Sequence, residues 1–375
     1  MESIEKSRDY YGKVASIIGI FVNILLAVGK IVVGLLFGFI SVMADGLNNL
    51  TDCGSSVVSF VSFKMSSKPA DKEHPYGHER IEYIASLVVS FIILLIAFEL
   101  FKESILKIIN PQMLEFSIVV IVALLVSIAV KCGMFFYYST VAKKINSDLL
   151  KATAIDSLSD CISTSIVLVS IVVGKLANVN IDGYAGIIVA VFISVAGFKI
   201  LKEMISKLIG QAPDKSIFES VKERILKHKE VLGIHDLNVY CYGPNKFFAS
   251  VHIELDSQTE SLVAHELIDD IEREFLNETN IILTGHHDPI VIDDEEVNFM
   301  REKVSKFVHE INAEYSMHDF RMVKGPTKTN LIFEVAIPFD AKDSEEDIIK
   351  ELKKQVAEID KKYKLVVMVE KQMFI

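Results

Sequence analysis

The chain has 375 residues, more than one ordinary hydrophobic core accommodates, so we expect two or more domains. A mean hydropathy of +0.37 together with 24% charged residues indicates one membrane-embedded half and one soluble half. The net charge of −11 excludes nucleic acid as the expected partner, because proteins that bind it present basic surfaces.

Six apolar stretches are long enough to cross the hydrocarbon core of a membrane, which takes about 20 helical residues. They cover residues 14–38, 41–63, 83–103, 115–138, 152–174 and 181–201. The first contains Asn23 and Lys30 and the fourth contains Lys131. Such residues are tolerated where they snorkel to the interface or pair inside a helical bundle.

Lysine and arginine set the expected orientation of these helices. They flank the loops after the second and fourth stretches and follow the sixth, at Lys64, Lys68, Lys72, Arg80, Lys143, Lys144, Lys151, Lys199, Lys202 and Lys207. The loop between the first two stretches has no basic residue. The positive-inside rule therefore predicts a multi-pass protein of the cell membrane with both termini in the cytoplasm.

The second and fifth stretches are the most polar, and each contains two oxygen-bearing side chains four residues apart: Asn48 with Asp52, and Asp156 with Asp160. Residues at this spacing share one helix face, about 6 Å apart along the axis. An ionisable group at this depth costs about 2.5–3.5 kcal/mol, so it usually faces a polar interior. Helix-to-helix hydrogen bonding is the ordinary alternative, but two matched pairs favour a cation site.

The donors of this site are all oxygen atoms, which suit Mg, Ca and Mn, whereas imidazole and thiolate favour Zn, Cu and Ni. Asp45 lies three residues before Asn48 on the same face. It is an accessory candidate on the entry path, with helix capping as an equal alternative.

A short loop contains a second group of potential ligands, Asp71, His74 and His78, within Lys68-Pro-Ala-Asp-Lys-Glu-His-Pro-Tyr-Gly-His78. Two histidines and an aspartate in eight residues match metal chemistry, but exposed histidines are also common in polar loops. Both interpretations stay open from the residues alone.

After Gly210–Asp214, the pattern becomes that of a soluble α+β domain. Residues 215–291 are expected to form helix, strand, strand, helix and strand, with a hairpin of 237–242 and 246–254 around Gly243-Pro244-Asn245. Ile234-His235-Asp236 recurs 83 residues later as Met317-His318-Asp319. We therefore expect three parts: residues 1–209, 210–291, and a degenerate repeat at 292–375.

The first soluble unit has a third group of potential ligands, namely His235, His252, His286 and Asp288, with His265 and His287 as accessory candidates. Gly285-His-His-Asp-Pro289 has the density of a metal-binding cluster, although ordinary surface histidines are an equal alternative. His309 and His318 of the second unit have no comparable neighbours in sequence.

Between about residues 10 and 290, the chain resembles the cation diffusion facilitator family of divalent-metal/proton antiporters. The motifs are Ala44-Asp-Gly-Leu-Asn-Asn-Leu-Thr-Asp52, Pro69–His78, Asp156-Ser-Leu-Ser-Asp160, Gly233-Ile-His-Asp236 and His286-His-Asp-Pro289. The resemblance implies a homodimer of six-helix membrane bundles with ferredoxin-like cytoplasmic domains. It puts the family's transport, loop and cytoplasmic metal sites on the three groups of residues named above.

The fifth stretch indicates the metal. Zinc-transporting members of this family typically have a histidine where this chain has Asp156, and the set of Asn and Asp ligands resembles the manganese-exporting branch. Residues 292–375 lie outside the family pattern.

The resemblance implies a secondary transporter and no enzyme: Mn(II) leaves the cytoplasm in exchange for protons by alternating access. The divalent ion is a substrate, and no prosthetic group is expected. Expected partners are metal, protons, the lipid bilayer and a second copy of the chain. Efflux of Fe(II) or Zn(II) and a membrane-anchored metal sensor are the alternatives; no nucleophile–base pair supports a metalloenzyme.

Overall fold

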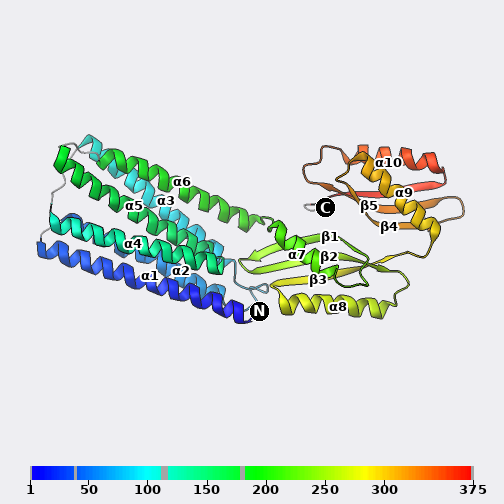
Figure 1. Ribbon diagram of the computed structural model, residues 1–375, viewed down its shortest axis with the longest axis horizontal. Helices are drawn as coiled ribbons and strands as arrows, with labels where there is room; N and C mark the ends of the chain where they lie inside the picture. The colour runs from blue at the N-terminus through cyan, green and yellow to red at the C-terminus, as the bar shows by residue number, and fades with distance from the viewer. Residues whose placement is uncertain (1, 38–39, 111–116, 178–181, 373–375) are drawn as a thin grey trace. The chain divides into compact units, whose positions relative to one another are not determined.

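The computed structural model describes residues 2–37, 40–110, 117–177 and 182–372 (Figure 1). It divides into two compact units. The first comprises Met1–Gln211 with Tyr242–Lys246, and the second comprises Ala212–Cys241 with Phe247–Ile375.

The first unit is a bundle of long helices that run side by side (Figure 1). They are α1 (Glu2–Phe37), α2 (Ile40–Ser66), α3 (Ile81–Ile109), α4 (Ile118–Ile145), α5 (Asp148–Ala177) and α6 (Asp182–Ile209). The most extensive contacts join α1 to α2, α3 to α6, and α4 to α5, and α2 also packs against α5.

Four helices in the described part of the chain are long and apolar enough to cross a membrane, at Arg8–Val33, Ile81–Ile109, Ile118–Ile145 and Asp148–Val173. The two other predicted spans fall on α2 and α6, of 27 and 28 residues. The outer surface of the bundle is apolar, as Leu95 at 67% exposure and Ile188 at 72% illustrate. A surface of this kind belongs in lipid, because lipid solvates apolar side chains at no cost.

Serine hydroxyls line the inner face of α2, at Ser55, Ser56, Ser59 and Ser62, all buried. Ser59 donates to the carbonyl oxygen of Ser55 at 2.9 Å, a hydrogen bond within the helix. The Ser59 and Thr153 hydroxyls also lie 3.2 Å apart and join α2 to α5. The bundle is therefore apolar outside and polar along the seam between these two helices.

A buried charge network closes one end of the bundle. The Glu82 carboxylate at the start of α3 is fully buried, and it accepts hydrogen bonds from the Arg8 guanidinium of α1 and, at 2.6 Å, from the Ser147 hydroxyl. Arg8 Nε also donates to the carbonyl oxygen of Ile145 at 3.0 Å. Three segments far apart in sequence are thus held by one carboxylate, an arrangement in which every charge is paired.

The second unit contains the order helix, strand, strand, helix, strand twice. The first copy consists of α7 (Lys215–Ile225), β1 (Gly233–Gly243), β2 (Lys246–Asp256), α8 (Ser261–Glu278) and β3 (Ile281–Ile290). The second consists of α9 (Glu295–Ile311), β4 (Ser316–Lys324), β5 (Thr329–Pro338), α10 (Glu345–Ile359) and β6 (Tyr363–Gln372).

Each copy forms its own three-stranded sheet, in the order β1-β2-β3 and β4-β5-β6, with its own hydrophobic core. β2 pairs with β3, and β5 with β6, in parallel, so α8 and α10 serve as the crossovers that a parallel pair requires. Asp236 and Asp319 occupy the same place in the two copies, and both have a positive φ, of 50° and 49°. The backbone thus repeats in detail where the sequence repeats weakly.

Candidate metal-binding sites

The bundle brings together three of the four residues predicted for transport. Asp52 on α2 and Asp156 on α5 are buried, at 8% and 5% exposure. Asp160 lies one turn after Asp156 on α5 and is half-buried. We call Asp52, Asp156 and Asp160 the carboxylate cluster.

Lys131 on α4 lies within this cluster, which sequence reasoning missed. Its ammonium nitrogen donates to Asp52 Oδ2 at 2.7 Å and to Asp160 Oδ2 at 2.6 Å. One buried cation therefore joins carboxylates from α2 and α5, and it offsets the cost of burying them. A lysine in an apolar stretch was the only sequence signal, and it did not reveal which acids the side chain reaches.

The side chains of Asn48 and Asp45 lie outside the described residues, so their predicted roles stay predictions. The neighbouring Asn49 is buried, and its Oδ1 accepts a hydrogen bond from Lys30 of α1 at 3.1 Å. Lys30 is therefore among the polar residues that pair inside the bundle, as expected for a lysine in this position.

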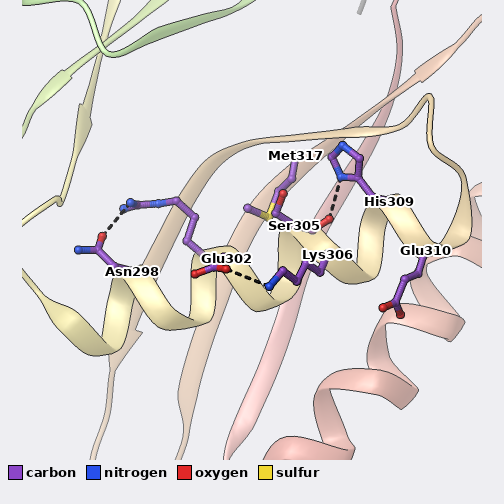
Figure 2. A pocket seen from close by; sticks show the side chains of 8 residues that line it. Asn298, Glu302, Ser305, Lys306, His309, Glu310 and Met317 are labelled. Carbon is purple, nitrogen blue, oxygen red and sulfur yellow. Dashed lines mark hydrogen bonds and ion pairs between the residues drawn. The ribbon is translucent and has the colours of Figure 1, made fainter.

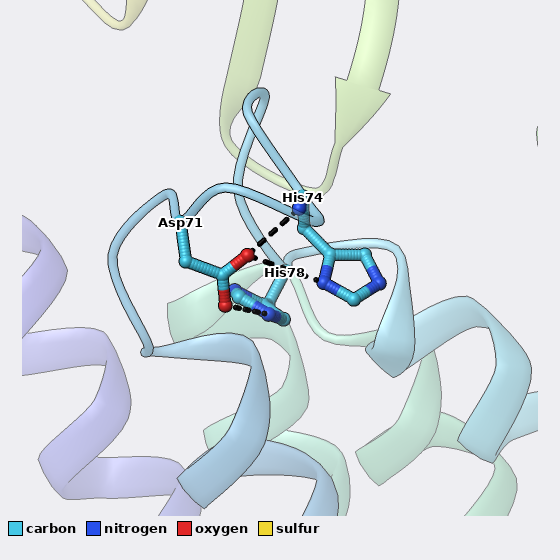
Figure 3. Close-up of side chains that lie close together, drawn as sticks. All are labelled: Asp71, His74 and His78. Atoms are coloured by element: carbon cyan, nitrogen blue, oxygen red, sulfur yellow. Dashed lines mark hydrogen bonds and ion pairs between the residues drawn. The ribbon is translucent and has the colours of Figure 1, made fainter.

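Asp71, His74 and His78 converge in the loop after α2, as Figure 3 shows. Asp71 Oδ1 lies 3.4 Å from His74 Nδ1, and Asp71 Oδ2 lies 3.3 Å from His78 Nε2. The backbone N–H groups of His74 and Glu73 also donate to Asp71 and lower its carboxyl pKa. The loop thus presents a carboxylate between two imidazoles, which could hold a divalent ion.

The first soluble sheet brings together all four residues predicted for the cytoplasmic site, which we call the Asp288 cluster. Asp288 Oδ2 lies 2.8 Å from His235 Nε2 and 2.9 Å from His252 Nδ1, and Asp288 Oδ1 lies 3.3 Å from His286 Nε2. The parallel register places His252 beside His286 and Glu254 beside Asp288. Three strands therefore supply ligands to one point.

The charges of this cluster reinforce one another. Burial opposes a charged His235, but the nearby Asp236 and Asp288 carboxylates outweigh it and raise the His235 pKa to about 10. Burial would raise the pKa of Asp288, yet His235 and His252 lower it to about 2. His235 thus holds a proton next to Asp288, and a metal ion bound at its ring would have to displace that proton.

The accessory candidates lie differently. His265 is exposed on α8, and His287 points to the opposite side of β3 from His286 and Asp288, because successive strand residues alternate. His318, for which sequence predicted no neighbours, instead stacks on His235, with ring centroids 5.3 Å apart and ring planes 10° apart. That expectation was wrong, because the two repeats meet at these histidines.

A hollow of about 810 Å³ lies along α9, as Figure 2 shows. Its polar groups pair within the helix, as Lys306 does with Glu302 at 2.9 Å and His309 Nδ1 with the Ser305 carbonyl at 2.9 Å. Groups already paired along one helix do not converge on a ligand, so this hollow is not a candidate site.

Comparison with known proteins decides the family. The cation efflux transmembrane domain matches residues 16–209, and the cytoplasmic domain of cation efflux proteins matches residues 213–290. The chain belongs to the cation diffusion facilitator family. It is therefore a multi-pass membrane protein and a secondary transporter of divalent cations, and it is not an enzyme.

Relatives cover most of the chain. An uncharacterized transporter of Methanocaldococcus jannaschii is 34% identical over 69% of this chain and 89% of its own. The manganese efflux system protein MneS of Bacillus subtilis is 30% identical over 74% of this chain and 94% of its own. The cation-efflux pump FieF of Shewanella oneidensis is 24% identical over 76% and 96%, respectively.

Proposed function

We propose that this transporter exports Mn(II) from the cytoplasm in exchange for protons, with the ion bound by Asn48, Asp52, Asp156 and Asp160. The observation that supports this most is the position of Lys131, whose ammonium joins the Asp52 and Asp160 carboxylates inside the bundle. Because Asp52 of α2 and Asp160 of α5 both bind the Lys131 ammonium, they are also placed to bind one metal ion together.

The choice of Mn(II) rests on ligand chemistry. Carboxylate and amide oxygens are hard donors, and they bind manganese without the imidazole that zinc prefers. The relative MneS is named as a manganese efflux protein. Fe(II) and Zn(II) remain the alternative cargoes, since divalent zinc binds most sites more tightly than manganese.

Exchange for protons follows from the acids themselves. A buried carboxylate holds a proton or a metal ion, because metal binding requires the deprotonated form. We further infer that Lys131 compensates Asp52 and Asp160 while the site holds no ion. Alternating access would then exchange ion and protons at one place, with both termini in the cytoplasm.

We also propose a homodimer in which the loop residues Asp71, His74 and His78 and the Asp288 cluster bind metal as sensors of its cytoplasmic concentration. The match to the cytoplasmic domain of cation efflux proteins supports this assembly. Metal would favour one arrangement of the two cytoplasmic domains only if it binds that arrangement more tightly.

The test is Mn(II) uptake into proteoliposomes with an imposed pH gradient. We expect gradient-dependent uptake by the wild type, loss in Asp156→Ala, and retention in Glu99→Ala, whose side chain is 61% exposed on α3. Competition by Zn(II) and Fe(II) in the same assay separates the cargoes.

The result that contradicts transport at this site is equal uptake by the wild type and Asp156→Ala. Absence of uptake in both, with Mn(II) still bound by the purified protein, would favour the membrane-anchored sensor. The sensor also predicts that His252→Ala abolishes function and Asp52→Ala does not.

A further inference from the structure

The two tandem repeats of the second unit meet at His235. The ring of His318, from β4, stacks in parallel on the ring of His235, from β1. Gln372, on β6, donates a hydrogen bond from its amide to Asp236. Side chains of the second repeat therefore touch His235, a member of the Asp288 cluster, and its neighbour in sequence, Asp236.

His235 is buried, with 4% of its surface exposed, and its two ring nitrogens have no well-directed hydrogen bond to any described residue. Nε2 faces Asp288 at 2.8 Å, and Nδ1 faces Asp236 at 3.5 Å. A buried polar atom without a hydrogen bond is costly, so its presence calls for a ligand. Nδ1 is thus the ring nitrogen that does not face Asp288, and Asp236 is the carboxylate beside it.

Glu334 completes a group on this side. His235, Asp236 and Glu334 each offer one ligand atom, and these three atoms all lie within 4.8 Å of one another. Glu334 is on β5, in register opposite His318. Two side chains of the first repeat, His235 and Asp236, thus lie close to one carboxylate of the second repeat, Glu334.

The surroundings are acidic, because Asp236 and Glu370 both lie near Glu334. A divalent cation would relieve the repulsion among these carboxylates.

We propose that the two repeats share a divalent-cation site formed by His235 Nδ1, Asp236 and Glu334. One imidazole and two carboxylates suit a first-row metal such as Mn(II), Fe(II) or Zn(II). The site gives residues 292–375 a role, since metal bound here fastens the second repeat to the first. It does not depend on the transport proposal.

His235 connects the new site to the Asp288 cluster. A neutral imidazole has one free lone pair, so His235 binds one ion at a time, through Nε2 or through Nδ1. Occupation of one site therefore withdraws a ligand from the other. The second repeat thereby competes with the Asp288 cluster for His235.

The test is equilibrium dialysis of Mn(II), and separately Zn(II), against the full chain in detergent micelles. His252→Ala serves as the background, because it weakens the Asp288 cluster and leaves His235 available. In this background we expect Glu334→Gln to lose one bound ion per chain, or to bind that ion at least tenfold more weakly. Glu358→Gln, an exposed carboxylate on α10, is the matched control and should bind as the background does.

Asp236→Asn is a second variant and should show the same loss. Thermal unfolding of the metal-free proteins checks that each variant folds like its background. An unchanged number and affinity of bound ions in both Glu334→Gln and Asp236→Asn would overturn the proposal. Dialysis counts bound ions whether or not the protein exports them, so this result is distinct from a failure of transport.

Discussion

The ammonium nitrogen of Lys131 lies 2.6 Å from Asp160 Oδ2. This oxygen atom belongs to the proposed transport site. Under that proposal Lys131 is an internal cation that competes with the transported ion, and full metal binding requires Lys131 to move.

Replacing this lysine should therefore change affinity in a defined direction. We expect Lys131→Met to bind Mn(II) at least about tenfold more tightly, about 1.4 kcal/mol, because the competitor is gone. Titration calorimetry of the detergent-purified protein measures this. Lys131→Arg retains the charge and should bind Mn(II) as weakly as the wild type. Lys30→Met is the control, because this buried lysine pairs with Asn49 instead, and it should not tighten Mn(II) binding. Equal binding by Lys131→Met would show that the lysine does not compete with the metal, and weaker binding would show that it assists the metal.

The identity of residue 156 should decide which metal is exported. Asp156→His replaces a hard oxygen donor by an imidazole, and we expect weaker Mn(II) transport together with new Zn(II) transport. Proteoliposome uptake of each ion provides the measurement, with Asp156→Glu as a control that retains a carboxylate. A variant that keeps full Mn(II) transport and gains no Zn(II) transport would refute the ligand argument.

The charge network around Glu82 predicts a loss of stability without a specific loss of binding. Glu82→Ala leaves the buried Arg8 guanidinium without its carboxylate, which costs about 3–5 kcal/mol. We expect the thermal midpoint in detergent to fall by about 10 °C. The double variant Arg8→Met with Glu82→Leu should recover most of this loss, because no charge is left buried. If the single and double variants unfold at the same temperature, the pair is not what closes the bundle.

The Asp288 cluster predicts how stability depends on pH in the absence of metal. The pKa of His235 rises from 6.5 to about 10 on folding, so its contribution is complete below pH 6.5 and lost as the pH rises through 10. The pKa of Asp288 falls from 3.8 to about 2, so its contribution is present above pH 3.8 and lost as the pH falls through 2.

Denaturant unfolding of the EDTA-treated chain across this range checks both slopes. Asp288→Asn should remove the acidic limb and reduce the alkaline limb, which Asp236 still supports because it also faces His235. His309→Asn, an exposed histidine on α9, should leave both limbs in place. An alkaline limb of unchanged size in Asp288→Asn would assign it to another group.

Sequence and structure agree best where burial of a polar group is expensive. Asp52 and Asp156 could be found because an acid inside an apolar stretch requires a reason. The hairpin could also be found from alternation, although β1 and β2 extend beyond the predicted 237–242 and 246–254, to Gly233–Gly243 and Lys246–Asp256.

What sequence could not supply was pairing over long distances. Lys131 and Asp52 are 79 residues apart, and Arg8 and Glu82 are 74 apart, so neither pair leaves a local pattern. His318 was assigned no partner because its neighbours in sequence contain no histidine cluster. Its partner, His235, lies in the other repeat, and only the contact between the repeats brings the two rings together.

The positive φ of Asp236 and Asp319 has a consequence for which residues these two positions accept. A left-handed backbone costs most residues other than glycine about 1–2 kcal/mol, and aspartate is among the few that adopt it readily. Both aspartates also use their side chains, since Asp319 pairs with Arg321 at 2.6 Å and Asp236 accepts a hydrogen bond from Gln372. Glycine would therefore keep the bend at either position and lose the pairing, whereas a β-branched residue would disturb both.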